Sequence, residues 1–81
     1  MYKLLIVEDD LIIAQGLQKH FEKYHYEVSC VENFENVLDD FIQYKPDLVL
    51  LDIHLPFFDG YYWCQEIRKI SQVPIVFISS A

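Results

Sequence analysis

Three acidic side chains follow or end short apolar runs of this sequence, where together they could hold a metal ion. Glu8 and Asp9 come directly after the run KLLIV (3–7), and Asp52 ends the run DLVLLD (47–52). If these runs form neighbouring parallel strands, which lie about 4.8 Å apart, the carboxylates can reach one ion. Gathered carboxylates repel one another unless a cation lies between them, and Mg²⁺ prefers oxygen ligands. The sequence therefore predicts a magnesium site formed by these three residues.

A carboxylate in such a site has a second possible chemistry, because it can attack phosphorus and form an acyl phosphate. Phosphoryl transfer depends mostly on positioning and charge neutralisation, which a metal ion and hydrogen-bond donors supply. The alternative is that each acid caps a helix or faces solvent, and we assign that role to Asp10 and Asp59. Capping alone does not explain Glu8, Asp9 and Asp52 at adjacent strand ends, so we favour the metal site for them.

Histidine and cysteine, the other common metal-binding residues, show no ligand spacing. His20 and His25 lie on or just after a predicted helix and His54 lies in a loop, so imidazole coordination is not predicted. Cys30 and Cys64 lie within apolar patterns and form no CxxC motif. This favours buried thiols over redox or metal roles.

The composition of the 81 residues is that of one packed domain, with 53% hydrophobic and 16% aromatic residues. Thirteen acidic and six basic residues give a net charge of -7, which disfavours nucleic-acid binding by this segment. No apolar run approaches the roughly 20 residues that span a bilayer. Because the first residues lead straight into a strand pattern, we expect no signal peptide and a cytoplasmic location.

Strand patterns alternate with helix patterns along the chain. The predicted strands span residues 3–7, 26–31, 47–52 and 75–79. Apolar strands that alternate with helices predict an α/β fold with a doubly wound, flavodoxin-like parallel sheet in the order 2-1-3-4. In that order the first and third strands are neighbours at the edge where such sheets bind ligands. Glu8, Asp9 and Asp52 would meet there, with Ser79 at the end of the fourth strand.

Apolar residues at helical spacing predict three helices between the strands. They span about residues 11–24, 34–45 and 60–69. Their apolar stripes include Leu11 and Tyr24 in the first helix and Ile42 in the second. We expect Asn33 to cap the second helix, and Pro46 to end it because proline disfavours helical geometry in the residue before it.

Three stretches resemble the receiver domain of two-component response regulators. They are LLIVEDD (4–10), DLVLLDIHLPFFDG (47–60) and VPIVFISS (73–80). Their order and spacing match the family over the whole chain, so residues 1–81 are expected to form a single receiver domain. The stretch YYWCQEIRK (61–69), followed by the third of them, is similar to regulators of cell-envelope and antimicrobial-peptide responses in the winged-helix OmpR/PhoB subfamily.

The resemblance implies a role for each candidate site residue. Asp52 matches the phosphoacceptor, and Asp9 matches the acid that binds Mg²⁺ directly, with Glu8 as its partner. His54 matches the position whose backbone carbonyl, not its ring, coordinates the metal. Ser79 matches the serine or threonine that hydrogen-bonds the phosphoryl group and moves on activation. The resemblance thus implies a phosphoacceptor and not an enzyme in the usual sense.

The resemblance also implies partners and further parts of the domain. A sensor histidine kinase would donate the phosphoryl group, and a DNA-binding effector outside this chain would be controlled through homodimer formation. The family's phosphate-contacting lysine, aromatic switch residue, fifth strand and last two helices would lie beyond Ala81. We therefore expect an incomplete receiver domain whose fourth strand is an uncovered apolar edge that favours self-association. Ser80 stands where the family more often has alanine, with little consequence for the metal site.

Three other classes compete with this interpretation. A phosphohydrolase of the haloacid-dehalogenase kind needs a second carboxylate two residues after its aspartate, where this sequence has His54. A flavin carrier of the same fold would place its phosphate against Glu8, Asp9 and Asp10, which would repel it. A docking module that never takes phosphate remains open, although the acidic set argues against it.

Overall fold

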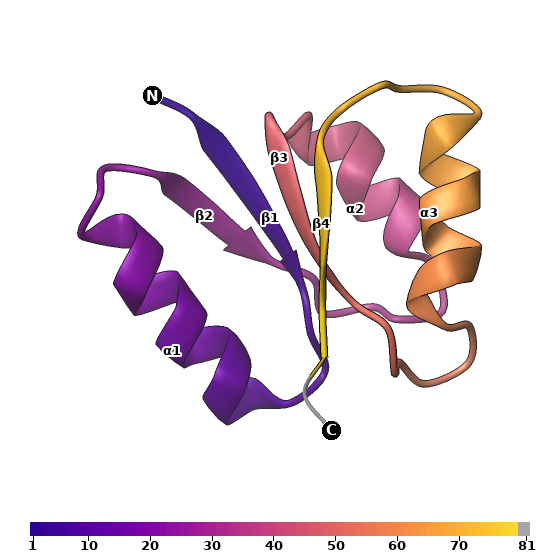
Figure 1. Ribbon diagram of the computed structural model, residues 1–81, viewed down its shortest axis with the longest axis horizontal. Helices are drawn as coiled ribbons and strands as arrows, with labels where there is room; N and C mark the ends of the chain where they lie inside the picture. The colour runs from indigo at the N-terminus through magenta and orange to yellow at the C-terminus, as the bar shows by residue number, and fades with distance from the viewer. Residues whose placement is uncertain (80–81) are drawn as a thin grey trace.

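The computed structural model describes residues 1–79, in which four strands alternate with three helices (Figure 1). The strands are β1 (Lys3–Val7), β2 (Glu27–Cys30), β3 (Leu48–Asp52) and β4 (Ile75–Ile78). The helices are α1 (Leu11–Glu22), α2 (Val37–Tyr44) and α3 (Gly60–Arg68). Every predicted element is present, and Ser80 lies outside the described residues. Within residues 1–79, no helix is long and apolar enough to cross a bilayer.

All strand pairs in the sheet are parallel, and the strand order is β2-β1-β3-β4. The predicted flavodoxin-like α/β fold and its strand order are therefore confirmed. Val7 pairs with Leu51, and Asp52 pairs with Ile78. The three strands β1, β3 and β4 thus end side by side, and the chain leaving each of them starts from the same edge of the sheet.

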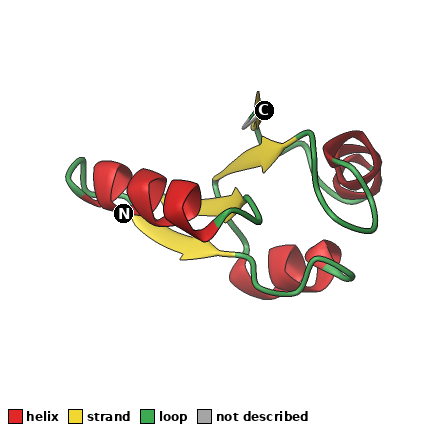
Figure 2. Cartoon of the chain, turned by 90° about the horizontal axis from the view of Figure 1, so that it is seen from below, coloured by secondary structure: helices red, strands yellow, loops and turns green. Residues whose placement is uncertain are grey.

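The core consists of two apolar layers, one on each face of the sheet. The layer under α1 is formed by Leu4, Ile6, Ala14 and Leu50. The layer under α2 and α3 is formed by Leu5, Val7, Val31, Val37, Phe41, Val49, Leu51, Trp63 and Ile67. Figure 2 shows α1 and α2 on opposite sides of the strands. Since the central strands β1 and β3 are covered on both faces, the polar residues at their ends are held by a closely packed support.

The second helix begins three residues later than predicted, and Asn36 caps it instead of Asn33. Asn36 Oδ1 accepts the N–H of Asp39 at 3.2 Å. Asn33 Oδ1 accepts the N–H of Glu35 at 3.1 Å, within a turn that precedes the helix. Both asparagines suit a cap, and the tight turn at Asn33 leaves that role to the later one. The helix ends as predicted, at Lys45, which has a left-handed φ of 54°.

Three residues of the predicted apolar stripes are exposed in the structure. Leu11 and Tyr24 expose 72% and 65% of their surface, and Ile42 exposes 50%. Leu11 begins α1 and Tyr24 lies beyond its end, so neither continues the buried face of the helix. In α2 the buried residues are Val37 and Phe41, four positions apart, and this stripe is too narrow to include Ile42.

Candidate functional site

Glu8, Asp9 and Asp52 lie together at the carboxyl-terminal edge of the sheet. One carboxylate oxygen from each lies within 4.8 Å of the other two. Glu8 and Asp52 expose only 2% and 0% of their surface, whereas Asp9 is exposed. The pairing of Val7 with Leu51 places the residues after β1 beside the end of β3. The predicted acidic cluster is therefore present, and it opens to solvent on the Asp9 side.

The buried carboxylate of Glu8 is hydrogen-bonded through only one of its oxygens. Oε2 accepts the N–H of Asp10 at 3.0 Å, while Oε1 has no hydrogen-bond donor among the described residues. Burial raises the pKa of Glu8 to about 7; the Asp10 amide opposes this shift, and the nearby carboxyls of Asp52 and Asp9 add to it. A buried ionised oxygen without a partner is costly in free energy. A cation would supply the contact that Glu8 Oε1 lacks and would relieve the repulsion between the carboxylates. The site therefore fits Mg²⁺.

Asp52 is oriented by the backbone of the loop that follows it. The N–H of His54 donates to Asp52 Oδ1 at 3.1 Å. The ring of His54 is exposed and is not among the three side chains of the acidic cluster. His54 therefore touches the site through its backbone, while metal coordination by its carbonyl remains a prediction.

Ser79 follows β4 directly and is exposed. Its neighbour Ile78 is the register partner of Asp52, and the N–H of Ile53 donates to the Ile78 carbonyl at 3.1 Å. Ser79 thus leaves the sheet one residue beyond the partner of Asp52. This is the edge predicted for it, and a role toward a phosphoryl group remains a prediction.

The other two acids of these loops cap helices, as predicted. Asp10 Oδ1 accepts the N–H groups of Ile12 and Ile13 at 3.0 and 3.3 Å. Asp59 Oδ1 accepts the N–H of Tyr62 at 2.9 Å. These caps fix the first turns of α1 and α3, which both begin at the edge that carries the acidic cluster.

Gly60 also belongs to the surroundings of the site, although the sequence reasoning did not single it out. It is buried at the start of α3, and its N–H donates to the carbonyl of Ile53 at 2.9 Å. A Cβ atom at this position would lie 2.3 Å from the backbone oxygen of Asp52. The available signal is a glycine at the first residue of a predicted helix, since glycine is often found where another backbone approaches closely.

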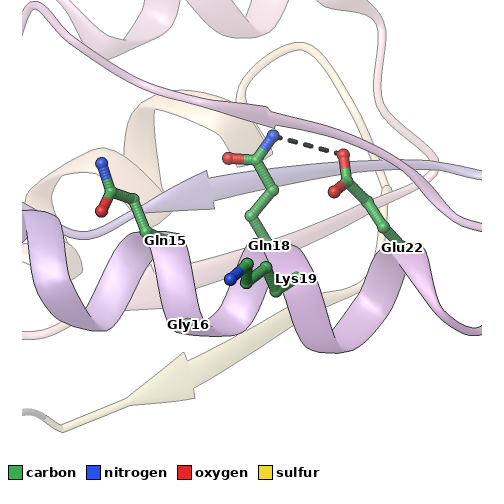
Figure 3. A pocket seen from close by; sticks show the side chains of 5 residues that line it. All are labelled: Gln15, Gly16, Gln18, Lys19 and Glu22. Atoms are coloured by element: carbon green, nitrogen blue, oxygen red, sulfur yellow. Dashed lines mark hydrogen bonds between the residues drawn. The ribbon is translucent and has the colours of Figure 1, made fainter.

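An open hollow along α1 contains none of the predicted site residues (Figure 3). It is lined by Gln15, Gly16, Gln18, Lys19 and Glu22. Gln18 Nε2 donates to Glu22 Oε2 at 3.3 Å across one helical turn. Mixed polar groups of this kind are usual on the solvent face of an amphipathic helix, so we assign the hollow no function.

Residues 4–81 match the sequence model of the response regulator receiver domain family. The chain belongs to the response regulator receiver domain family. It is thus a receiver domain of a two-component response regulator and not a classical enzyme. Its acidic cluster lies at the phosphorylation site expected in such a domain.

This receiver domain is similar to parts of longer regulatory and sensory transduction proteins. The uncharacterized transcriptional regulatory protein YvcP of Bacillus subtilis is 56% identical over 80 residues, which are 99% of this chain and 34% of YvcP. The sensory transduction protein BceR of Halalkalibacterium halodurans is 45% identical over 80 residues, which are 99% of this chain and 35% of BceR. The chain spans about a third of the length of these relatives.

Solved receiver domains share the fold closely. The N-terminal domain of the nisin resistance regulator NsrR, a lantibiotic response regulator, is 47% identical with a TM-score of 0.90 over 100% of this chain and 68% of that chain. This agrees with the predicted similarity to antimicrobial-peptide regulators. The regulator TrrA of Thermotoga maritima, in complex with Mg²⁺-BeF, is 32% identical with a TM-score of 0.90 over 100% of this chain and 71% of that chain. In the complex of TrrA with the histidine kinase ThkA, the identity is again 32% and the TM-score is 0.87, over 99% of this chain and 70% of that chain.

Proposed function

We propose that this receiver domain accepts a phosphoryl group on Asp52 from a sensor histidine kinase, with Mg²⁺ held by the acidic cluster. The observation that carries the proposal is a fully buried aspartate within 4.8 Å of two further carboxylates, at the edge where parallel sheets bind ligands. TrrA, which has the same fold, is known with Mg²⁺-BeF and with a histidine kinase. These complexes support the same cofactor and the same class of partner for this chain.

The residues present suit a magnesium ion. Asp9, Asp52 and the backbone carbonyl of His54 would hold it, with Glu8 beside them. Mg²⁺ typically takes one or two carboxylates and keeps several waters, and the exposed Asp9 leaves the site open for them. When bound, Mg²⁺ neutralises the carboxylates and the charge on the phosphoryl oxygens.

The transfer itself is a displacement at phosphorus. A carboxylate oxygen of Asp52 forms a bond to phosphorus while the P–N bond of the kinase's phosphohistidine breaks. The electron pair of that bond returns to the imidazole nitrogen. The N–H of His54 holds the Asp52 carboxylate in place from 3.1 Å, and Ser79 would donate a hydrogen bond to the transferred group.

Phosphorylation would control a DNA-binding effector of the winged-helix OmpR/PhoB class outside this chain. The relatives include transcriptional regulators about three times as long as this chain, which leaves room for such an effector. With a net charge of -7, the receiver domain itself is unsuited to contact DNA. The proposed role requires a cytoplasmic location, because the effector acts on DNA there.

Intact-mass measurement after incubation with acetyl phosphate and Mg²⁺ tests this function. We expect the mass to increase by one phosphoryl group, and the increase to be lost with EDTA or in Asp52→Asn. Asp39→Asn, at an exposed position of α2, should leave the reaction unchanged. In a protein that also contains the family's phosphate-contacting lysine, Mg²⁺ binding without a gain in mass would contradict phosphoacceptance. A chain that binds no Mg²⁺ would favour a docking module.

A further inference from the structure

Gly60, the first residue of α3, lies directly against the backbone of the proposed phosphoacceptor. A Cβ atom at this position would lie 2.3 Å from the carbonyl oxygen of Asp52 and 3.0 Å from the Cα of Ile53. The N–H of Gly60 donates to the Ile53 carbonyl at 2.9 Å, and this hydrogen bond fixes the approach. Every other residue type would bring a Cβ into this contact.

The reason for glycine here is space and not backbone conformation. No glycine of the described chain has a positive φ, so alanine can adopt the backbone angles of residue 60. The atoms in the way are backbone atoms, which cannot rotate aside as the end of a flexible side chain can. Ordinary contact begins at 3.4 Å. A Cβ on Gly60 would therefore push the two backbones apart by about 1 Å in a tightly packed interior.

Both sides of the contact are anchored in the fold. Asp52 is fully buried and pairs with Ile78 of β4. On the other side, Trp63 and Ile67 bury α3 in the larger apolar layer. If the two backbones are pushed apart, the loop between β3 and α3 has to change its conformation. This loop contains the His54 N–H that donates to Asp52 Oδ1.

We propose that Gly60 is a positioning residue of the phosphorylation site, because its missing Cβ lets the start of α3 set the place of the Asp52 carboxylate beside Glu8 and Asp9. A shift of about 1 Å matters here, since Mg²⁺ demands near-octahedral ligands at about 2.0–2.1 Å. The inference rests on the proposed function, as it concerns the same metal and phosphoryl site.

The direct test compares Gly60→Ala with Gly16→Ala. Apart from its chain neighbours and the backbone of its own helix, Gly16 has no atom within 4 Å of the place of its Cβ, so it provides the same substitution without the contact. The Kd for Mg²⁺ is measured through the fluorescence of Trp63, at a temperature where near-UV circular dichroism shows each variant folded. We expect Gly60→Ala to weaken Mg²⁺ binding by about tenfold or more, as losses in the shell around a metal site do. Gly16→Ala should stay within about twofold of the wild type.

A second control distinguishes an effect on the position of Asp52 from an effect on the packing stability of α3. Ile67→Val removes one buried methylene from the same helix and should lower the free energy of unfolding while leaving the Kd for Mg²⁺ unchanged. A folded Gly60→Ala with the wild-type Kd would overturn the proposal. Equal losses of affinity in Ile67→Val and Gly60→Ala would do the same, because the effect would then follow stability alone.

The wild-type chain offers a readout that does not depend on whether Gly60→Ala folds. The sequence contains two glycines, so the amide resonances of Gly60 and Gly16 are readily assigned by NMR. On addition of Mg²⁺ we expect the Gly60 amide to shift together with that of His54, and the Gly16 amide to stay in place. A His54 shift without a Gly60 shift would overturn the positioning role. The absence of any response to Mg²⁺ would contradict the proposed function on which it rests.

Discussion

Among single residues, the three clustered carboxylates differ in how far they are removed from water. Asp52 and Glu8 are buried, and Asp9 remains at the surface. The Glu8 oxygen without a donor is the most direct sign that the described chain does not complete its own site. A cation is the partner that three convergent carboxylates most readily accept.

The raised pKa of Glu8 predicts a pH-dependent stability in the absence of metal. Its pKa is raised from 4.5 to about 7, so the folded chain keeps a proton that the unfolded chain releases in this range. The resulting stabilisation is fully present below pH 4.5 and is lost as the pH rises through 7. In EDTA, Glu8→Gln should therefore gain about 3 kcal/mol in unfolding free energy relative to the wild type between pH 4.5 and pH 8.

Urea unfolding of both proteins across this pH range measures that difference. Saturating Mg²⁺ should reduce it, because the ion stabilises the ionised carboxylates of the wild type. A difference that stays constant with pH would show that Glu8 is not held in the environment described here.

At the scale of the elements, the loop between β3 and α3 contains a strained backbone conformation at Phe57, and a substitution there can relieve it. Phe57 has a φ of 68° and exposes 69% of its surface, so it adopts a left-handed conformation without the compensation of burial. Such a conformation costs a non-glycine residue about 1–2 kcal/mol. Phe57→Gly should raise the unfolding free energy by up to about 1 kcal/mol, after the greater entropy of glycine in the unfolded chain is subtracted.

Thermal or urea unfolding checks this, with Phe58→Gly as the neighbouring control. Phe58 stacks on Tyr62 with ring centroids 4.3 Å apart and contacts Trp63, so its loss should destabilise the protein. Equal destabilisation by both substitutions would contradict a strained Phe57.

Helix α1 provides the opposite case, a glycine that the fold does not require. The Cβ of an alanine at Gly16 would meet nothing within 4 Å. Gly16→Ala should therefore stabilise the protein by about 0.5–1 kcal/mol, because alanine loses less backbone entropy in a helix. Circular dichroism during thermal unfolding measures the change, and a lower midpoint temperature would contradict it.

The sequence predicted these elements well where the pattern itself carries the information. Apolar runs that alternate with helices predict the parallel strand order, and that order brings Glu8 and Asp9 beside Asp52. The choice of Asn36 over Asn33 as a cap depends on a local turn, and residue type alone does not resolve it. The role of Gly60 depends on the distance between two backbones, which a sequence pattern does not contain.

At the scale of the whole molecule, β4 forms one edge of the described sheet with its apolar side chains partly uncovered. Val76 and Phe77 expose 49% and 38% of their surface, and the Phe77 ring lies 5.2 Å from that of Tyr61. An exposed apolar edge strand is a template for pairing with another chain. We therefore predict that the 81-residue chain self-associates through β4 in a concentration-dependent manner.

Sedimentation velocity at several concentrations tests this. Val76→Lys should shift the equilibrium toward monomer, because a charge on an edge strand opposes pairing. Ile12→Lys, at a position of α1 that is 83% exposed, should leave it unchanged. A wild-type chain that stays monomeric at all concentrations would refute association through β4.

The proposed signalling role depends on one bond, that between phosphorus and a carboxylate oxygen of Asp52. The most direct measurement is to phosphorylate the chain with acetyl phosphate and Mg²⁺, reduce the acyl phosphate with borohydride, and locate the modified residue by peptide mass spectrometry. We predict homoserine at position 52, and none when Mg²⁺ is withheld. Homoserine at another aspartate, such as Asp9, would contradict Asp52 as the phosphoacceptor. So would the absence of homoserine despite bound Mg²⁺ in a protein that includes the family's phosphate-contacting lysine.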